Sequence, residues 1–309
     1  MWDIRYKRNN EWSDYLMSEV KYEKLDGSII NPINENFKMR KGDTPFNYIV
    51  IDDFLKPEVH LEIKNEFMDI PIDVNDLYKG HLMAPVDGPM LVGYARDWHD
   101  AYRMYITPKH NLRLNFFLQS DYNQFIESFW PDIPFTNEML FDVHHHEKFS
   151  RDGFVHNDFD PSTFNQQYYK GTDISYSYAG GDACDNPDPN IRYVQKSMAC
   201  VYYFGLGSKI NEDEPVGGHT AFFTDDDRVI PYGGIEPLEN RILMFEIGPK
   251  SFHASRTNNT LYRDALFGWH HSEMSYMKEK YPDDDLCLNV REPGAFQPSH
   301  DRSYGNAVE

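Results

Sequence analysis

The sequence predicts a mainly β protein (α+β by class), a sandwich or barrel of many short strands that follows a smaller helical part. Two observations carry this prediction. From about residue 138 onward, short aromatic and β-branched runs alternate with Gly, Pro, Asn and Asp. Before that point, two segments have apolar residues at helical spacing. The chain has 309 residues, which is enough for one large domain with a substantial core.

The first half contains the predicted helices. Residues 1–46 are polar and mixed, and we expect an N-terminal extension that wraps on the main body, residues 47–275. The apolar run Tyr48–Leu55 predicts a buried strand, and Pro57 stands where a helix can begin. A second helix is predicted from Asp121 to Phe129, because its apolar residues fall on one face.

The second half contains the predicted strands and one long connection. The segment 159–196 is polar and rich in Tyr, and it reads as a lid insertion, because so long a loop in a compact domain is usually functional. The polar tail, residues 276–309, is expected to be ordered only in part. The predicted strands are Leu140–Val143, Met198–Phe204, Thr220–Phe223, Arg241–Ile247 and Asp264–Trp269.

Composition argues against several classes of partner. The formal net charge is −20, and so acidic a surface repels phosphate backbones, which argues against nucleic acid. No apolar stretch is long enough to span a membrane, and the start lacks a signal core. Three cysteines, Cys184, Cys200 and Cys287, are few and widely spaced. They argue against a disulfide framework and for a reducing, cytoplasmic location. Nothing indicates the oligomeric state.

One short motif has the chemistry of a metal site. In His156-Asn157-Asp158, a His and a carboxylate two residues apart share a face if the segment is extended. Non-haem iron that activates dioxygen needs two imidazoles and one carboxylate on one side and open positions on the other. The motif alone is weak, because His60-Leu61-Glu62, His145-His146-Glu147 and His271-Ser272-Glu273 match it too.

The surrounding motifs occur in an order that makes the match more specific. The run after Tyr48 and the segments that follow the His-x-Asp motif together resemble the prolyl-4-hydroxylase-like branch of the Fe(II)/2-oxoglutarate-dependent dioxygenases. The resemblance covers roughly residues 47–272. It implies a double-stranded β-helix (jelly-roll) core with flanking helices. It also implies Fe(II) as cofactor, 2-oxoglutarate and dioxygen as cosubstrates, and stimulation by ascorbate. The segments after His156 that carry it are Met198–Phe204, Gly217–Phe223, Asn240–Phe245, Ser251–Ala254 and Arg263–His270.

Within this resemblance, His156, Asp158 and His253 match the metal ligands, which are the expected catalytic centre. Since Asp158 is present, the halogenase variant of the chemistry, in which a small residue replaces the acid, is disfavoured.

Four further residues match positions around 2-oxoglutarate. Arg263, ten positions after His253, matches the basic residue that holds the far carboxylate. A planar guanidinium can hold a carboxylate through two parallel hydrogen bonds. Tyr203 matches a tyrosine that reaches the same carboxylate, and Cys200 and Thr220 match positions that line the cosubstrate pocket. Packing in the core is an alternative role for Tyr203, Cys200 and Thr220.

The run His144-His145-His146 departs from the pattern of the family, in which the corresponding strand often contributes Tyr. Alternate histidines of a strand would point inward. Either a second metal site or a hydrogen-bonded strand would account for them.

The substrate does not follow from these residues. The expected activity is hydroxylation of an unactivated C–H bond in a small molecule or amino-acid-like substrate, with succinate and CO2 as co-products. A peptidyl prolyl hydroxylase of the same family is the alternative. Two other classes stay open, a cupin-like metalloenzyme and a non-catalytic module that binds 2-oxoglutarate.

Overall fold

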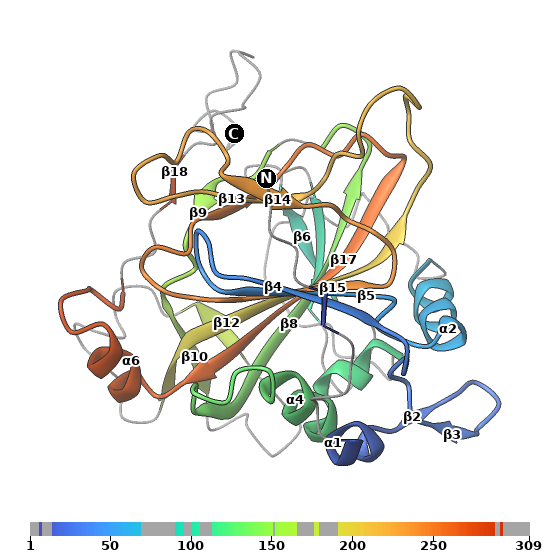
Figure 1. The fold of residues 1–309 in the computed structure, drawn as a ribbon, viewed down its shortest axis with the longest axis horizontal. Coiled ribbons are helices and arrows are strands. Elements are labelled where there is room, and N and C mark those ends of the chain that lie inside the picture. Colours follow the sequence, from blue (N-terminus) through green and yellow to red (C-terminus); the bar gives the residue numbers. More distant parts are fainter. Residues whose placement is uncertain are drawn as a thin grey trace.

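The computed structural model describes residues 6–7, 14–68, 90–95, 101–105, 113–150, 152–165, 176–178, 191–287 and 291–292. These residues form two antiparallel sheets that face each other, with helices at the periphery (Figure 1). The mainly β class predicted from the sequence is confirmed.

The larger sheet has eleven strands. Two of them, β10 (Pro161–Asn165) and β11 (Tyr176–Tyr178), lie off the main path, and β10 pairs with the first half of β12. The main path runs in the order β1 (Tyr6–Lys7), β4 (Lys38–Gly42), β5 (Tyr48–Asp52), β15 (Arg241–Glu246), β12 (Ile191–Leu206), β17 (Tyr262–Ser272), β8 (Phe135–Glu147), β7 (Ala101–Tyr105) and β6 (Met90–Ala95).

The smaller sheet lies above the larger one in Figure 1. Its five strands are short, and they follow the order β14 (Gly233–Ile235), β13 (Thr220–Phe222), β16 (His253–Ser255), β9 (Val155–His156) and β18 (Arg291–Glu292).

The connectivity of these strands is that of a double-stranded β-helix. From β8 the chain crosses to β9, returns to β12, crosses to β13 and β14, returns to β15, crosses to β16 and ends in β17. Each crossing joins the larger sheet to the smaller one, so the two sheets wind around a common interior. The expected jelly-roll core is therefore confirmed by the strand order itself.

Strand β12 separates the two hydrophobic layers. Its side chains alternate, so Met198, Cys200 and Tyr202 point to one face and Val201 and Tyr203 to the other. The first face packs on the helices, and the second faces the smaller sheet. Helices α2 (Pro57–Met68), η2 (Arg113–Leu118) and α4 (Ser120–Glu127) supply the outer layer, and α1 (Asp14–Glu19) packs against α4. Both predicted helices are thus confirmed, as α2 and α4.

Two boundaries of the expected domain plan fall within continuous structure. In the N-terminal extension, β4 pairs with β5 along its whole length, so this part continues the larger sheet. At the C-terminal boundary, helix α6 (Met274–Lys280) spans residue 275, and its Met277 packs between the sheets. The short strands β2 (Tyr22–Glu23) and β3 (Ile29–Ile30) form a separate hairpin.

Both ends of the expected lid, residues 159–196, are strands, and the role of the segment as a lid stays a prediction. Residues 161–165 are β10, and residues 191–196 belong to β12, where they pair with each other in the larger sheet. These strands were missed because Pro161, Ser162 and Thr163 lack the apolar alternation by which strands are recognised. Apart from β11, the middle of the segment lies outside the described residues.

The cysteines also differ in part from the expectation. Cys200 is a free, buried thiol, whereas Cys287 is disulfide-bonded. The expectation of a chain without disulfides is therefore wrong at Cys287, because spacing along a sequence does not reveal which thiols the fold brings together. Because Cys287 is disulfide-bonded, the cysteines no longer support the expectation of a reducing compartment.

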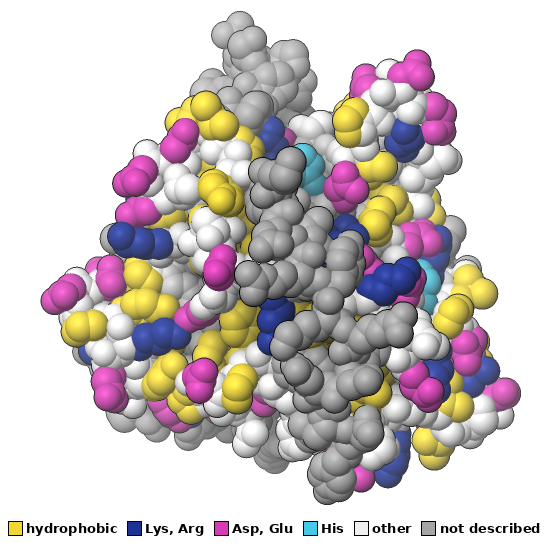
Figure 2. Space-filling view, viewed as in Figure 1, with side chains coloured by type: hydrophobic (Ala, Val, Ile, Leu, Met, Phe, Trp, Pro, Cys, Tyr) yellow, Lys and Arg dark blue, Asp and Glu magenta, His cyan; other side chains and the backbone are white. Residues whose placement is uncertain are grey.

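Two surface expectations can be compared with the described residues. No helix among them is long and apolar enough to cross a membrane. Figure 2 shows charged side chains of both signs spread over one face, with acidic ones prominent along its outline, in keeping with the net charge of −20.

Candidate active site

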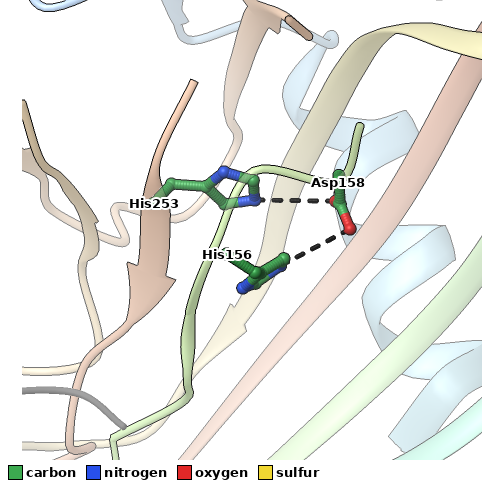
Figure 3. Close-up of side chains that lie close together, drawn as sticks. All are labelled: His156, Asp158 and His253. Atoms are coloured by element: carbon green, nitrogen blue, oxygen red, sulfur yellow. Dashed lines mark ion pairs between the residues drawn. The ribbon is translucent and has the colours of Figure 1, made fainter. Parts of the chain in front are cut away.

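Three side chains with metal-ligating atoms converge at one end of the smaller sheet. His156 on β9 and His253 on β16 are directly opposite each other in the antiparallel ladder, and their ring centroids are 4.3 Å apart. Asp158 follows two residues after His156. One ligand atom from each of the three lies within 4.8 Å of the others (Figure 3). This is the set of residues that the sequence predicted as metal ligands.

A turn, and not an extended strand, brings Asp158 to the histidines. Strand β9 ends at His156, and Asp158 has a φ of 54°, in the left-handed region that Asp and Asn tolerate better than most residues. The backbone N–H of Asp160 donates to the carbonyl of Asp158 at 2.8 Å and closes the turn. The expectation that one extended segment aligns His156 and Asp158 is therefore wrong in its geometry, although the two side chains do meet.

Both imidazoles are oriented by backbone carbonyls. Nδ1 of His156 donates to the carbonyl of Phe154, and Nδ1 of His253 donates to the carbonyl of Ser251, each at 2.8 Å. With the proton on Nδ1, each Nε2 keeps its lone pair for a metal, an arrangement common among metal-binding histidines. Nε2 of His156 lies 3.6 Å from Oδ1 of Asp158, and Nε2 of His253 lies 3.6 Å from Oδ2. Two atoms that are each about 2.0–2.2 Å from one ion are at most about 4.4 Å apart, so both separations can accommodate a shared ion.

Side chains around the turn connect the two ligand-bearing segments. Asn157 Nδ2 donates to the carbonyl of Pro249, and the hydroxyl of Ser251 donates to the carbonyl of Asn157, both at 3.0 Å. Because Ser251 also orients His253, the turn that carries Asp158 and the loop that carries His253 are held in one hydrogen-bonded unit.

The carboxylate of Asp158 is buried and held from the side of the larger sheet. Trp269, on the inner face of β17, donates its indole N–H to Oδ2 of Asp158 at 2.8 Å. Burial alone would raise the pKa of this carboxyl. The interactions of this carboxylate with His156, Lys196 and His253 outweigh burial, and its pKa lies well below its usual value. Asp158 is therefore ionised at neutral pH, as a metal ligand must be.

A second group of residues is suited to an anion. Arg263 is fully buried on β17, and only Nη1 of its guanidinium has a hydrogen-bond acceptor, the carbonyl of Gly218 at 2.7 Å. Nε and Nη2 have no hydrogen-bond partner among the residues that the structure describes. The hydroxyl of Tyr203 is 2.7 Å from that of Thr220, and the Tyr203 ring centroid is 5.5 Å from the guanidinium carbon. Burial lowers the pKa of Arg263, which means that the buried charge lacks full compensation and that an anion would relieve it.

Gly218 allows this group to form. Its φ of +74° lies in the region that glycine adopts freely, and a Cβ there would lie 3.1 Å from Cδ of Arg263. Gly218, in the segment Gly217–Phe223 that carries the resemblance, thus directs its carbonyl toward Arg263.

The metal-ligand group and the anion group are neighbours on the smaller sheet. Thr220 and Phe222 lie two residues apart on β13, opposite Ser255 and His253 respectively. Two residues of a strand span about 7 Å. Thr220, which meets the hydroxyl of Tyr203 beside Arg263, therefore lies two residue pairs beyond His253, a separation that suits a short, extended dicarboxylate.

Cys200 does not belong to this group. It lies on the face of β12 opposite Tyr203, in the layer between the larger sheet and the helices, where it contacts the position of Gly268. The prediction that Cys200 lines the cosubstrate pocket is wrong, since residues three apart on a regular strand point to opposite faces.

The histidines of β8 divide between the two faces. His144 and His146 are buried and lie opposite Ala265 and Arg263 on the inner face, and the ring of His144 packs 4.2 Å from that of Phe267. His145 points the other way and binds Asp264. The inward orientation of alternate histidines is confirmed. In the described part of the chain, the metal-ligand group at His156 is the one cluster of its kind, so the alternative of a second metal site gains no support.

Sequence reasoning missed three residues that contact or surround Asp158. They are Trp269, which donates to it, and the buried pair formed by Lys196 and Asp160, whose Nζ and Oδ1 are 2.6 Å apart. The repeat of acids in Asp158-Phe159-Asp160 was a usable signal for Asp160. Nothing in the sequence indicated its partner, because the pair depends on how β10 aligns with β12.

Known proteins resemble this chain in structure and not in sequence. No family model and no curated protein matches the sequence. One similar structure is a prolyl hydroxylase from Trichoplax adhaerens, solved in complex with a hypoxia inducible factor peptide fragment. It is 13% identical in sequence with a TM-score of 0.45, and the alignment covers 77% of this chain and 87% of the hydroxylase chain. A Pseudomonas putida prolyl-4-hydroxylase is 13% identical with a TM-score of 0.43, covering 73% and 92%.

A third similar structure is the viral collagen prolyl hydroxylase of Paramecium bursaria Chlorella virus-1, in its 2-oxoglutarate complex. It is 15% identical with a TM-score of 0.40, covering 73% of this chain and 96% of its own. These similarities do not identify a reaction or a substrate for this chain.

Proposed function

We propose that this protein is an Fe(II)- and 2-oxoglutarate-dependent dioxygenase that hydroxylates an unactivated C–H bond. Succinate and CO2 would be its co-products. The observation that carries the proposal is the pairing of two groups inside one jelly roll. One is the set of two imidazoles and a carboxylate. The other is a buried arginine, Arg263, with two nitrogens that have no hydrogen-bond partner among the described residues. It lies beside Tyr203, whose hydroxyl meets Thr220 two residue pairs from His253.

The donor set favours iron among the metals of the cell. Two neutral nitrogens and one carboxylate on one side of the ion are typical of non-haem Fe(II) oxygenases, which keep the remaining positions open for cosubstrate and oxygen. His156, Asp158 and His253 would hold the ion. A bound Fe(II) would supply the activation of dioxygen, and the remaining roles fall to the protein.

The anion group favours 2-oxoglutarate over a monocarboxylic keto acid. Arg263 would bind the far carboxylate through Nε and Nη2, and the hydroxyls of Tyr203 and Thr220 would orient it. Burial raises the pKa of Tyr203 and outweighs the lowering influence of Arg263, so the phenol stays protonated and can donate. A keto acid without a second carboxylate would leave the guanidinium unpaired.

The protein would thus position two reactants and keep water out. Phe245 packs its ring 4.7 Å from that of His253, and Phe222 lies opposite His253 in the ladder, which gives the metal end an apolar wall. Such a wall strengthens the electrostatic interactions at the site and limits side reactions with water.

We further propose a small-molecule or amino-acid-like substrate. Asp142, His144 and His146 are buried and polar on the inner face of β8, next to Phe267 and Arg263. Hydrogen-bonding groups along this wall suit a polar small molecule better than an aliphatic chain.

The test is release of succinate from 2-oxoglutarate by purified protein with Fe(II), ascorbate and air, with and without candidate amino acids and prolyl peptides. Asp158→Asn is the matched control, because Asn also tolerates the left-handed backbone at this position. The proposal predicts succinate from the wild type and much less from Asp158→Asn and His253→Ala. Stimulation by prolyl peptides alone would favour the peptidyl prolyl hydroxylase. Metal-dependent turnover without 2-oxoglutarate would favour a cupin-like enzyme. Binding of 2-oxoglutarate without succinate under all conditions would favour a non-catalytic module.

A further inference from the structure

A buried lysine stands close to the proposed metal-binding carboxylate. Lys196, on the inner face of β12, has no exposed surface, and its Nζ lies 2.6 Å from Oδ1 of Asp160 and 4.0 Å from Oδ1 of Asp158. The same Nζ is 5.5 Å from the ring centroid of Trp269. A buried ammonium without a carboxylate partner is strongly disfavoured. Lys196 therefore needs an acid, and two are within reach.

Asp158 and Asp160 differ in their other contacts. Oδ1 of Asp158 is the oxygen that faces Nε2 of His156, so it points toward the proposed metal position. An ammonium that paired with this oxygen would compete with a metal ion for the same negative charge. Asp160 offers an equally buried carboxylate that has no contact with either histidine among the described residues.

The local backbone structure determines which of the two carboxylates pairs with Lys196. The turn at Asp158 directs the chain into β10, which begins at Pro161 opposite Gln195. Asp160 and Lys196 therefore come together where the β10–β12 ladder begins, and their contact is direct. Trp269 donates to Oδ2 of Asp158, whereas the oxygen of Asp158 nearest Lys196 is Oδ1, at 4.0 Å against 2.6 Å for Asp160.

We infer that Asp160 is a positioning residue that binds the ammonium of Lys196 and keeps it off Asp158, so that Asp158 stays available to a divalent metal. This inference rests on the proposed function only in taking Asp158 as a metal ligand. It assigns Asp160 no contact with metal, cosubstrate or substrate.

The inference predicts a specific pattern of metal affinities. In Asp160→Asn, Lys196 loses the carboxylate of Asp160 and moves onto Asp158, the other acid within 4.0 Å of its Nζ among the described residues, so metal binding weakens. Changes beside metal ligands typically reduce affinity about 10–100-fold, and we expect a loss in this range. In the double variant Asp160→Asn/Lys196→Met no ammonium remains to compete, so most of the loss is recovered. Lys196→Met alone binds metal at least as tightly as the wild type.

The experiment is calorimetric titration of metal-free protein with Mn(II), which needs no turnover and no exclusion of air. Asp52→Asn is the matched control, because Asp52 is also an acid with basic partners, and its ion pairs are with Arg40 and Arg241 rather than with a residue near the proposed metal site. Circular dichroism and the urea midpoint verify that each variant is folded.

Recovery of affinity in the double variant supports the inference, because a merely structural role of Asp160 would not be rescued by removing its partner. Unchanged affinity in Asp160→Asn overturns it, and so does equal weakness of the single and double variants. If Asp160→Asn does not fold, Lys196→Met decides, since weaker binding than in the wild type overturns the inference. Failure of the wild type to bind Mn(II) would instead overturn the metal site itself.

Discussion

Replacement of Arg263 by Met is expected to separate cosubstrate binding from folding. The guanidinium is fully buried, donates one hydrogen bond to Gly218 and keeps two nitrogens without partners. If those nitrogens bind the far carboxylate of 2-oxoglutarate, Arg263→Met leaves that carboxylate buried and unpaired. Truncating one partner of a buried charge pair costs about 2–5 kcal/mol. This corresponds to affinity for 2-oxoglutarate about 30- to 5,000-fold weaker.

Stability without cosubstrate is expected to change little in the same variant. Loss of the hydrogen bond to Gly218 costs about 1 kcal/mol. Removal of an incompletely paired buried charge acts in the opposite direction, since apolar replacement of buried ionic groups is often neutral or stabilising. The two effects nearly cancel, so the urea midpoint stays close to that of the wild type.

The assay is calorimetric titration of 2-oxoglutarate into Mn(II)-loaded protein, beside urea unfolding of the free protein. Arg40→Met is the control, because Arg40 is a partly buried arginine on β4 that is ion-paired with Asp52 and, among the described residues, makes no hydrogen bond or ion pair with Arg263, Tyr203 or Thr220. Arg263→Lys keeps the charge but loses the two parallel hydrogen bonds, so its affinity should be intermediate. Normal 2-oxoglutarate affinity in Arg263→Met would refute the assignment, whatever its stability.

Three smaller predictions follow from the same contacts. Tyr203→Phe removes a hydroxyl that meets Thr220 at 2.7 Å. The loss of one hydrogen bond, about 0.5–1.5 kcal/mol, should weaken 2-oxoglutarate binding about 2- to 12-fold. Unchanged affinity in calorimetry would contradict a role of Tyr203 in binding. Trp269→Phe keeps an aromatic ring but loses the N–H that donates to Asp158, so Mn(II) affinity should fall about 10–100-fold. Equal affinity would show that Trp269 does not support metal binding. Burial raises the pKa of the Cys200 thiol to about 12, so iodoacetamide at pH 8 should label Cys200 only in denaturant. Labelling of the native protein that 2-oxoglutarate prevents would instead place Cys200 in the cosubstrate pocket.

The three residues of the proposed metal site were predictable because the resemblance supplied what the motif lacked. His-x-acid patterns recur in the chain, and only the order of the later motifs distinguished His156 from His60. The register that sets His253 opposite His156 is a long-range property of the fold, and no local pattern encodes it. For the same reason, the pairing of Asp160 with Lys196 could not be foreseen.

Some errors could have been avoided from the sequence alone. Cys200 and Tyr203 are three apart on one predicted strand, so they could not both face the interior. Others could not, such as β10, whose polar residues lack a strand pattern and acquire their structure by pairing with β12. The left-handed backbone at Asp158 is of the same kind, since a turn of this sort is fixed by its surroundings.

The central claim is that Fe(II) and 2-oxoglutarate bind together, at the group formed by His156, Asp158 and His253 and beside Arg263. The most direct measurement is the visible absorption spectrum of the protein under anaerobic conditions, during titration of 2-oxoglutarate in the presence of Fe(II). The account predicts a charge-transfer band that requires both additions, saturates, and disappears in His253→Ala. Binding of both components without such a band, or an unchanged band in His253→Ala, would contradict it.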